Sequence, residues 1–160
     1  MHARIIGVIA GIRFVHVTDT SDPLAPLHEE SLRKIAATGI VRHFPKQTVL
    51  IHEGDVGDSL FLITRGEVNI NLALPHAVKA TRLATFGPGM CFGEMALIEG
   101  KPRSAQARAL TDAVVYSLDA VAFAKLKSDS PAIAFKLYTA LARQVAARLR
   151  NTSEQLRRNN

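Results

Sequence analysis

Two oppositely charged side chains, Glu94 and Arg103, lie in a short stretch of the chain whose other residues also suit the binding of a phosphate. The guanidinium of Arg103 is a planar fork of N–H donors that matches two phosphate oxygens at once. Ser104 adds a hydroxyl beside it, and the backbone N–H of Ala105 adds another donor. Gly93 has no Cβ, so its backbone lets a ligand come close. These residue types at this spacing predict an anion-binding site.

One helical turn is expected directly after Gly93, over residues 94–98. The free N–H groups at the start of such a turn carry partial positive charge, which favours an anion. The carboxylate of Glu94, however, should repel a phosphate. A ligand that presents a hydroxyl donor beside its phosphate reconciles the two. A 3′,5′-cyclic nucleotide is such a ligand, because its ribose 2′-OH is free beside the ring phosphate.

The residues before this site indicate one helix followed by many short strands. Residues 1–22 are β-leaning or irregular, with no obvious partner strand. Residues 27–38 have apolar residues at helical spacing, and Gly39 stands where a C-terminal cap belongs. Residues 41–118 alternate short apolar runs with glycine- and proline-containing turns, which is typical of a small β-barrel or jelly roll.

The last stretch of the chain is expected to be helical. Asp119 is a suitable N-cap for a helix over residues 120–128. Ser130 and Pro131 then begin a second helix, which has no breaker through Leu149 and extends as far as residue 156. The sequence therefore predicts an α+β fold in which strands dominate. It consists of an eight-stranded β-roll or jelly roll flanked by an N-terminal helix and two C-terminal helices.

The stretch Phe92–Ala105, FGEMALIEGKPRSA, is called the cassette here, because it resembles the phosphate-binding cassette of cyclic nucleotide-binding domains. That family includes protein kinase A regulatory subunits, the catabolite activator protein and cyclic nucleotide-gated channels. Its pattern is Phe-Gly-Glu, Leu or Met, Ala-Leu, a variable loop, then Pro-Arg, a small residue and Ala, and every fixed position is matched. Residues 53–63 and 66–68 are similar to the family's first strands and turns. The resemblance extends from about residue 24 to residue 149.

The resemblance implies a role for each site residue. Glu94 would bind the ribose 2′-OH and Arg103 the cyclic phosphate of cAMP or cGMP. The backbone of the cassette would complete the phosphate site, through Gly93, Met95, Ala96, Ser104 and Ala105. Ile70 and Phe86 match positions that wall the base. A lid residue on the last helix would cover the base, and the matching region holds Arg143 and Gln144.

The resemblance also implies an organisation and a function. Residues 23–150 would be the cyclic nucleotide-binding domain, with its lid helix from residue 131. Residues 1–22 would be an extension of uncertain structure, and residues 151–160 a basic helical tail. The expected function is that of a sensor that switches its C-terminal helix on binding the nucleotide, with no other cofactor. The alternatives are a regulatory fragment of a larger transporter, channel, enzyme or transcription factor, and a ligand-free structural remnant of the same fold.

Composition fits a soluble, cytoplasmic protein with no membrane span. Of the 160 residues, 48% are apolar and 21% are charged, which is ordinary for a globular domain. A single cysteine, Cys91, excludes an internal disulfide and a cysteine-based zinc site. The apolar run over residues 5–17 is too short and too interrupted to cross a bilayer.

The last helix carries an unusual charge and an apolar seam. The net charge is +6, and residues 143–158 hold five arginines against Glu154. Such a tail is either a solvated helix end or a contact for nucleic acid or an anionic membrane. Ala134, Leu137 and Leu141 are expected to pack on the β-roll. Residues at alternating spacings of three and four predict a short coiled-coil seam and a homodimer: Phe135, Tyr138, Ala142, Val145, Leu149, Thr152 and Leu156.

Other functions would require residues that this sequence does not contain in the necessary arrangement. A metal-dependent cupin enzyme needs a His-x-His pair with further ligands, and the six histidines, at positions 2, 16, 28, 43, 52 and 76, are not so paired. No serine, nor Cys91, has a persuasive histidine partner for nucleophilic catalysis. A helix-turn-helix reader of DNA needs about sixty further residues after the long helix. We therefore expect neither enzyme activity nor direct DNA binding by this chain.

Overall fold

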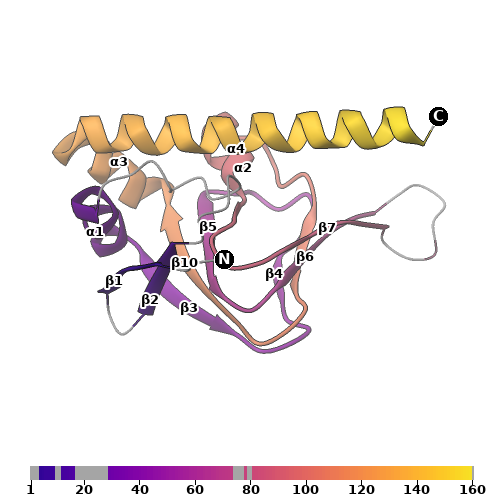
Figure 1. The fold of residues 1–160 in the computed structure, drawn as a ribbon, viewed down its shortest axis with the longest axis horizontal. Coiled ribbons are helices and arrows are strands. Elements are labelled where there is room, and N and C mark those ends of the chain that lie inside the picture. The colour runs from indigo at the N-terminus through magenta and orange to yellow at the C-terminus, as the bar shows by residue number, and fades with distance from the viewer. Residues whose placement is uncertain (1–3, 10–11, 17–28, 74–77, 79–80, 160) are drawn as a thin grey trace.

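In the computed structural model, two four-stranded antiparallel sheets pack beneath a long C-terminal helix (Figure 1). The structure describes residues 4–9, 12–16, 29–73, 78 and 81–159. The first sheet has the order β3 (Ile40–Phe44), β10 (Ala113–Asp119), β5 (Ser59–Arg65) and β8 (Cys91–Phe92). The second has the order β4 (Val49–Ile51), β9 (Gln106–Ala109), β6 (Val68–Leu72) and β7 (Thr81–Phe86). The predicted eight-stranded β-roll is confirmed.

Strand β5 explains why the roll has two apolar cores. All but its last two residues are buried, so the strand is apolar along its length instead of alternating with polar residues. Because successive side chains of a strand point to opposite faces, Leu60 and Leu62 pack toward the helices. Phe61 and Ile63 pack into the space between the two sheets. One strand thereby joins the helical layer to the roll.

Four helices accompany the sheets in the described part of the chain: α1 (Glu29–Thr38), α2 (Glu94–Glu99), α3 (Ala120–Asp129) and α4 (Pro131–Arg158). The carboxylate of Asp119 accepts a hydrogen bond of 2.7 Å from the N–H of Ala122, as its expected capping role requires. Ser130 precedes α4 as predicted, although its side chain makes no capping bond. Helix α4 is 28 residues long and runs along one side of the molecule, past the edge of the roll (Figure 1).

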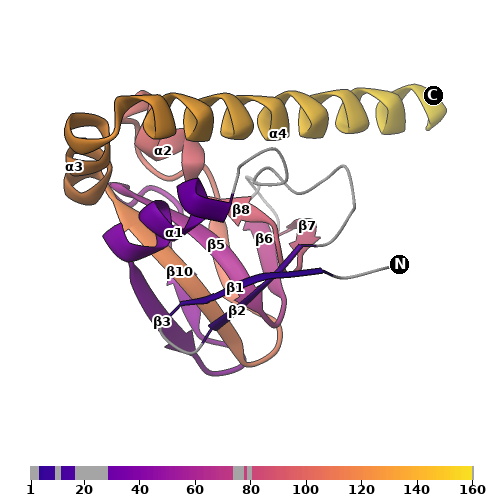
Figure 2. The same cartoon turned by 60° about the vertical axis from the view of Figure 1, so that its left-hand side comes forward.

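The N-terminal stretch forms a hairpin of its own. Strand β1 (Arg4–Ile9) pairs antiparallel with β2 (Ile12–His16), and the hairpin contacts α1 and β5. Figure 2 shows it crossing the roll beside α1. No partner strand for these residues was predicted from the sequence, and the structure corrects this, because the partner lies within the same stretch. Residues 1–3, 10–11 and 17–22 of the predicted extension lie outside the described residues.

Gly39 has a different role from the predicted helix cap. Its backbone is not in the left-handed region, which such a cap requires. A Cβ at this position would instead collide with the ring of Tyr116 and the carbonyl oxygen of Ser117. The hydroxyl of Tyr116, which is buried, donates a hydrogen bond to the carbonyl of Ile35 in α1. Glycine is needed here because α1 and β10 pack too closely for a side chain.

We expect Gly39→Ala to lower the free energy of unfolding by about 1–3 kcal/mol, the usual cost of overpacking a filled core. Gly87→Ala is the matched control, because a Cβ on Gly87 would meet no atom within 4 Å. Urea unfolding of both variants measures the difference. Equal stability of the two variants would contradict the packing role of Gly39.

Candidate functional site

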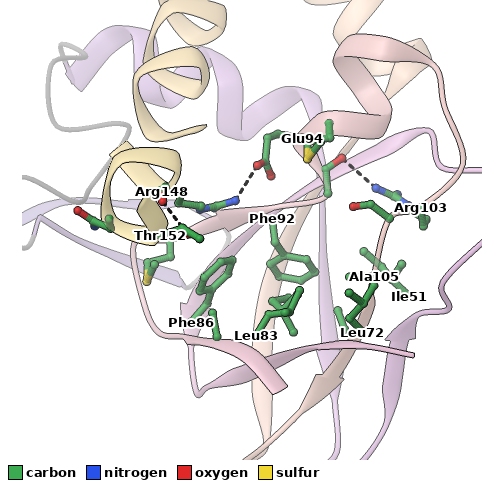
Figure 3. A pocket seen from close by; sticks show the side chains of 18 of the residues that line it. Ile51, Leu72, Leu83, Phe86, Phe92, Glu94, Arg103, Ala105, Arg148 and Thr152 are labelled. Atoms are coloured by element: carbon green, nitrogen blue, oxygen red, sulfur yellow. Dashed lines mark hydrogen bonds and ion pairs between the residues drawn. The ribbon is translucent and has the colours of Figure 1, made fainter. Parts of the chain in front are cut away.

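A cavity of about 550 Å³ lies between the cassette, the second sheet and α4 (Figure 3). One wall is apolar and comes from the strands, with Ile70 on β6 and Leu83 and Phe86 on β7. The cassette supplies Glu94 and Arg103 to the other side. The cavity therefore joins an apolar surface to two buried charges of opposite sign.

The turn at Gly93 sets the geometry of the cassette. Its φ of +78° lies in the left-handed region, which L-residues with a side chain rarely adopt. A Cβ here would also stand 2.6 Å from Nη1 of Arg103 and 2.9 Å from the carbonyl oxygen of Ser59. Helix α2 then begins at Glu94, as predicted. Glycine is therefore required both by the backbone and by the arginine that packs against it.

Arg103 is held at the cavity wall by backbone carbonyls. Its side chain donates from Nη1 to the oxygen of Gly93 and from Nη2 to the oxygen of Ser59, each at 2.9 Å. These bonds use two of the five guanidinium N–H groups, and the other three donate to no residue that the structure describes. Burial lowers the pKa of Arg103, and the nearby carboxylates of Asp58, Asp55 and Glu94 oppose that shift. The site thus contains a fixed cation with free donors.

Glu94 is 2% exposed, and a buried carboxylate needs a partner. That partner is Arg148 on α4, whose Nη1 donates to Oε1 of Glu94 at 2.7 Å (Figure 3). The ion pair offsets the charge of the buried carboxylate. Arg148 balances Glu94, so an anion placed in this cavity would meet less repulsion than it would from an unpaired carboxylate.

Helix α4 is hydrogen-bonded to the backbone carbonyl of Cys91, the residue directly before the cassette. The oxygen of Cys91 accepts hydrogen bonds from Nη2 of Arg148 and, at 2.8 Å, from Nε2 of Gln144. The guanidinium of Arg148 also lies 4.4 Å from the centre of the Phe86 ring, a cation–π distance. Arg148 therefore contacts the carboxylate, the backbone and the aromatic wall of the cavity.

The structure gathers most of the predicted site residues around the cavity. Those that line it are Gly93, Glu94, Met95, Arg103, Ser104, Ala105, Ile70 and Phe86. Ala96 lies in α2, and its side chain is outside what the structure describes. Arg143 is exposed, and Gln144 is buried against Cys91, so neither of these two lid candidates is among the lining residues.

Four lining residues of α4 were missing from the sequence prediction: Arg148, Asn151, Thr152 and Gln155. The spacing of residues along the helix could have identified them. The buried face of α4 passes through Leu137 and Leu141, and steps of three and four continue it to residues 144, 148, 151 and 155. The face changes from apolar to polar at Gln144. That change marks the point where α4 leaves the core and begins to cover the cavity.

The family model of the cyclic nucleotide-binding domain matches residues 41–130. This chain belongs to that family. A cyclic nucleotide-gated potassium channel of Rhizobium etli is 45% identical over 94 residues, which are 58% of this chain and 24% of the channel. A CRP-like cAMP-activated global transcriptional regulator of Mycobacterium tuberculosis is 33% identical over 113 residues, 71% of this chain and 48% of the regulator. The chain thus spans between a quarter and a half of these relatives.

Solved structures show the same fold. A cyclic nucleotide-binding domain from Methylobacillus flagellatus matches with a TM-score of 0.78 and 29% identity, over 84% of this chain and 75% of that one. The catabolite activator protein of Thermus thermophilus matches with a TM-score of 0.74 and 27% identity, over 84% and 61%. The predicted family and fold are confirmed. Among the described residues, no helix combines the length and apolarity needed to cross a bilayer.

We expect Gly93→Ala to lose about 2–4 kcal/mol of folding free energy, because the substitution adds both backbone strain and a collision with Arg103. Gly54→Ala is the control for backbone strain alone. Gly54 has a φ of +86°, and a Cβ there would meet no atom within 4 Å, so we expect a loss of about 1 kcal/mol. Denaturant unfolding compares the two, and an equal loss would show that Arg103 does not require the glycine.

Proposed function

We propose that this domain binds cAMP in the cavity between the cassette and α4, and that it acts as a regulatory domain without chemistry of its own. One observation carries the proposal: a single cavity presents a cation with free donors, a paired carboxylate and an apolar wall. A cyclic nucleotide has a phosphate, a ribose hydroxyl and a flat base in matching order. The phosphate would lie against Arg103, the 2′-OH against Glu94, and the base against Ile70 and Phe86.

The charges support this orientation. Arg103 is buried and already fixed by two carbonyls, so binding a phosphate would cost little further ordering of its side chain. Glu94 keeps Oε2 for a hydroxyl donor while Oε1 is bonded to Arg148. In the absence of the pair with Arg148, the carboxylate and the phosphate would repel each other in a site of low dielectric.

The choice of cAMP over cGMP rests on the relatives. The mycobacterial relative is named for activation by cAMP. Ser104 stands where a threonine in this family often favours guanine, and a serine is compatible with either base. On α4, Asn151, Thr152 and Gln155 bring polar side chains to the cavity, where they can hydrogen-bond the edge of a purine.

Helix α4 is the lid in this proposal. It supplies Arg148 to the cavity, and its contacts with the cassette pass through Cys91 and Glu94. A nucleotide that touches both the cassette and α4 would stabilise the arrangement in which they are in contact. Closure would then be a shift of population, limited by how differently the nucleotide binds the open and closed states.

We expect titration calorimetry to detect cAMP binding, and a ligand series to separate the roles of the two charged residues. Arg103→Ala should weaken cAMP by about 2–5 kcal/mol and leave adenosine, which has no phosphate, much less affected. Glu94→Ala should cost about 1.5–3 kcal/mol for cAMP and nothing for 2′-deoxy-cAMP. A merely structural role for either residue would weaken every ligand of the series equally. Failure of the parent protein to bind either cAMP or cGMP would overturn the proposal.

We expect cAMP to slow amide hydrogen exchange along residues 131–156, because ligand contacts to α4 reduce the population of the open state. Mass spectrometry of the parent protein with and without saturating cAMP measures this. Arg148→Met removes the lid contact to Glu94 and should show faster exchange in the absence of ligand. Unchanged protection in a saturated complex would refute the lid.

Pairing with a second copy through α4 stays a prediction. Phe135, Leu149 and Leu156 of the seam are 73%, 67% and 61% exposed, which leaves one row of it free. In the other row, Tyr138 packs edge-on against Phe123, and Thr152 lines the cavity. A coiled coil needs both rows, so the exposed row alone is weak support for a dimer.

A further inference from the structure

The face of α4 that points away from the roll carries two rows of side chains, each with a spacing of seven residues. The basic row is Lys136, Arg143, Arg150 and Arg157. The apolar row is Phe135, Ala142, Leu149 and Leu156. Because each member of one row is next in sequence to a member of the other, the two rows run parallel along the helix, about 100° apart around its axis. Figure 1 shows both sheets on the same side of α4, and no member of either row is among the buried residues of this helix.

The basic row is exposed and has no acidic partner. All four of its members are exposed, and none of these side chains forms an ion pair with another residue that the structure describes. Glu154 is the single acid of α4. The row covers 21 residue steps, about 32 Å of helix. Such a line of unpaired cations creates a strongly positive stripe.

The apolar row is exposed to an unusual degree. Phe135, Leu149 and Leu156 keep between 61% and 73% of their surface accessible, and Ala142 is exposed between them. Single exposed apolar residues are ordinary, but apolar residues that recur every two turns on one side of a helix are typical of an interaction surface. The opposite face of α4 is occupied by the core and by the cavity. The two rows are therefore accessible whether or not the cavity is filled.

We propose that these two rows form a docking surface for an anionic lipid bilayer. A helix that lies in the plane of a membrane inserts apolar residues between the lipids and places lysines and arginines among acidic headgroups. Both components are present on one face of α4 and run parallel over its length. The contact is peripheral, because the helix lies on the bilayer surface and does not cross it.

The charges favour a bilayer over other occupants. A second copy would cover the apolar row, but it offers only Glu154 on α4 to balance the four cations. A nucleic acid would balance the cations, but its phosphates give no favourable contact to Phe135, Leu149 and Leu156. An anionic lipid surface satisfies both rows, which neither a second copy nor a nucleic acid does.

The test is sedimentation of the full 160-residue chain with vesicles. We expect binding to phosphatidylcholine vesicles that contain about a third phosphatidylserine, and much weaker binding to phosphatidylcholine alone. Binding should fall as salt is raised, because ions screen the contact. The double variant Arg150→Gln, Arg157→Gln should bind about thirty-fold more weakly, since each cation near the surface contributes about a factor of five.

Matched controls separate the surface from total charge and from misfolding. Arg42→Gln with Arg65→Gln removes the same charge from exposed positions on the roll and should leave vesicle binding close to that of the parent. Leu149→Ser with Leu156→Ser should weaken vesicle binding while the basic row is intact. Titration of each variant with cAMP verifies its fold, and circular dichroism does so if the parent binds no nucleotide.

Three outcomes would overturn the proposal. The first is equal binding to neutral and acidic vesicles, or binding that the Arg150 and Arg157 substitutions leave unchanged. The second is a dimer by light scattering that Leu149→Ser breaks, together with no vesicle binding, which would assign the apolar row to a second copy. The third is tight binding of a DNA duplex without vesicle binding, unaffected by the leucine substitutions, which would assign the basic row to nucleic acid.

Discussion

The geometry of the site depends on two hydrogen bonds that the guanidinium of Arg103 donates to backbone carbonyls. They join the start of β5 at Ser59 to the turn at Gly93. The backbone of the same residue exchanges two hydrogen bonds of 2.8 Å with Gly54 and Asp55. Residues 54–59 and the turn at Gly93 thus meet at one residue. The cation is held in place by the fold itself, so in the proposed function its structural and binding roles would coincide.

The ion pair between Glu94 and Arg148 is a second such contact, and it connects the cassette to α4. A buried carboxylate is costly alone, and its partner comes from a helix 54 positions further along the chain. The cassette and α4 therefore share one ion pair. In the proposed function, a ligand that engages Glu94 would act on the same group that holds α4, which would provide a direct physical route from binding to the position of the helix.

Residue types and local spacing were sufficient to predict most of the roll, and the resemblance to a known family implied the cassette and the roles of Glu94 and Arg103. The cap at Asp119 and the turn at Gly93 depend on nearby residues, and the sequence shows those directly. Arg148 could not be assigned in the same way, because its place depends on how far α4 extends across the cassette. Strand β8 has two residues, too few for any periodic signal. Gly39 was predicted to be a helix cap because the residue that excludes a side chain there, Tyr116, is distant in sequence.

A single residue, Ser130, connects α3 to α4, and this short connection has a mechanical consequence. Helix α4 continues without a break for 28 residues, about 42 Å, from a junction at Ser130 that is anchored by Leu126 in the core. A rigid rod pivoted at one end amplifies displacement in proportion to distance from the pivot. A tilt of about 10° at Ser130 would move the far end by about 7 Å. The residues beside the cavity lie partway along this lever, so a displacement at Arg148 is enlarged about 1.6-fold at Arg158.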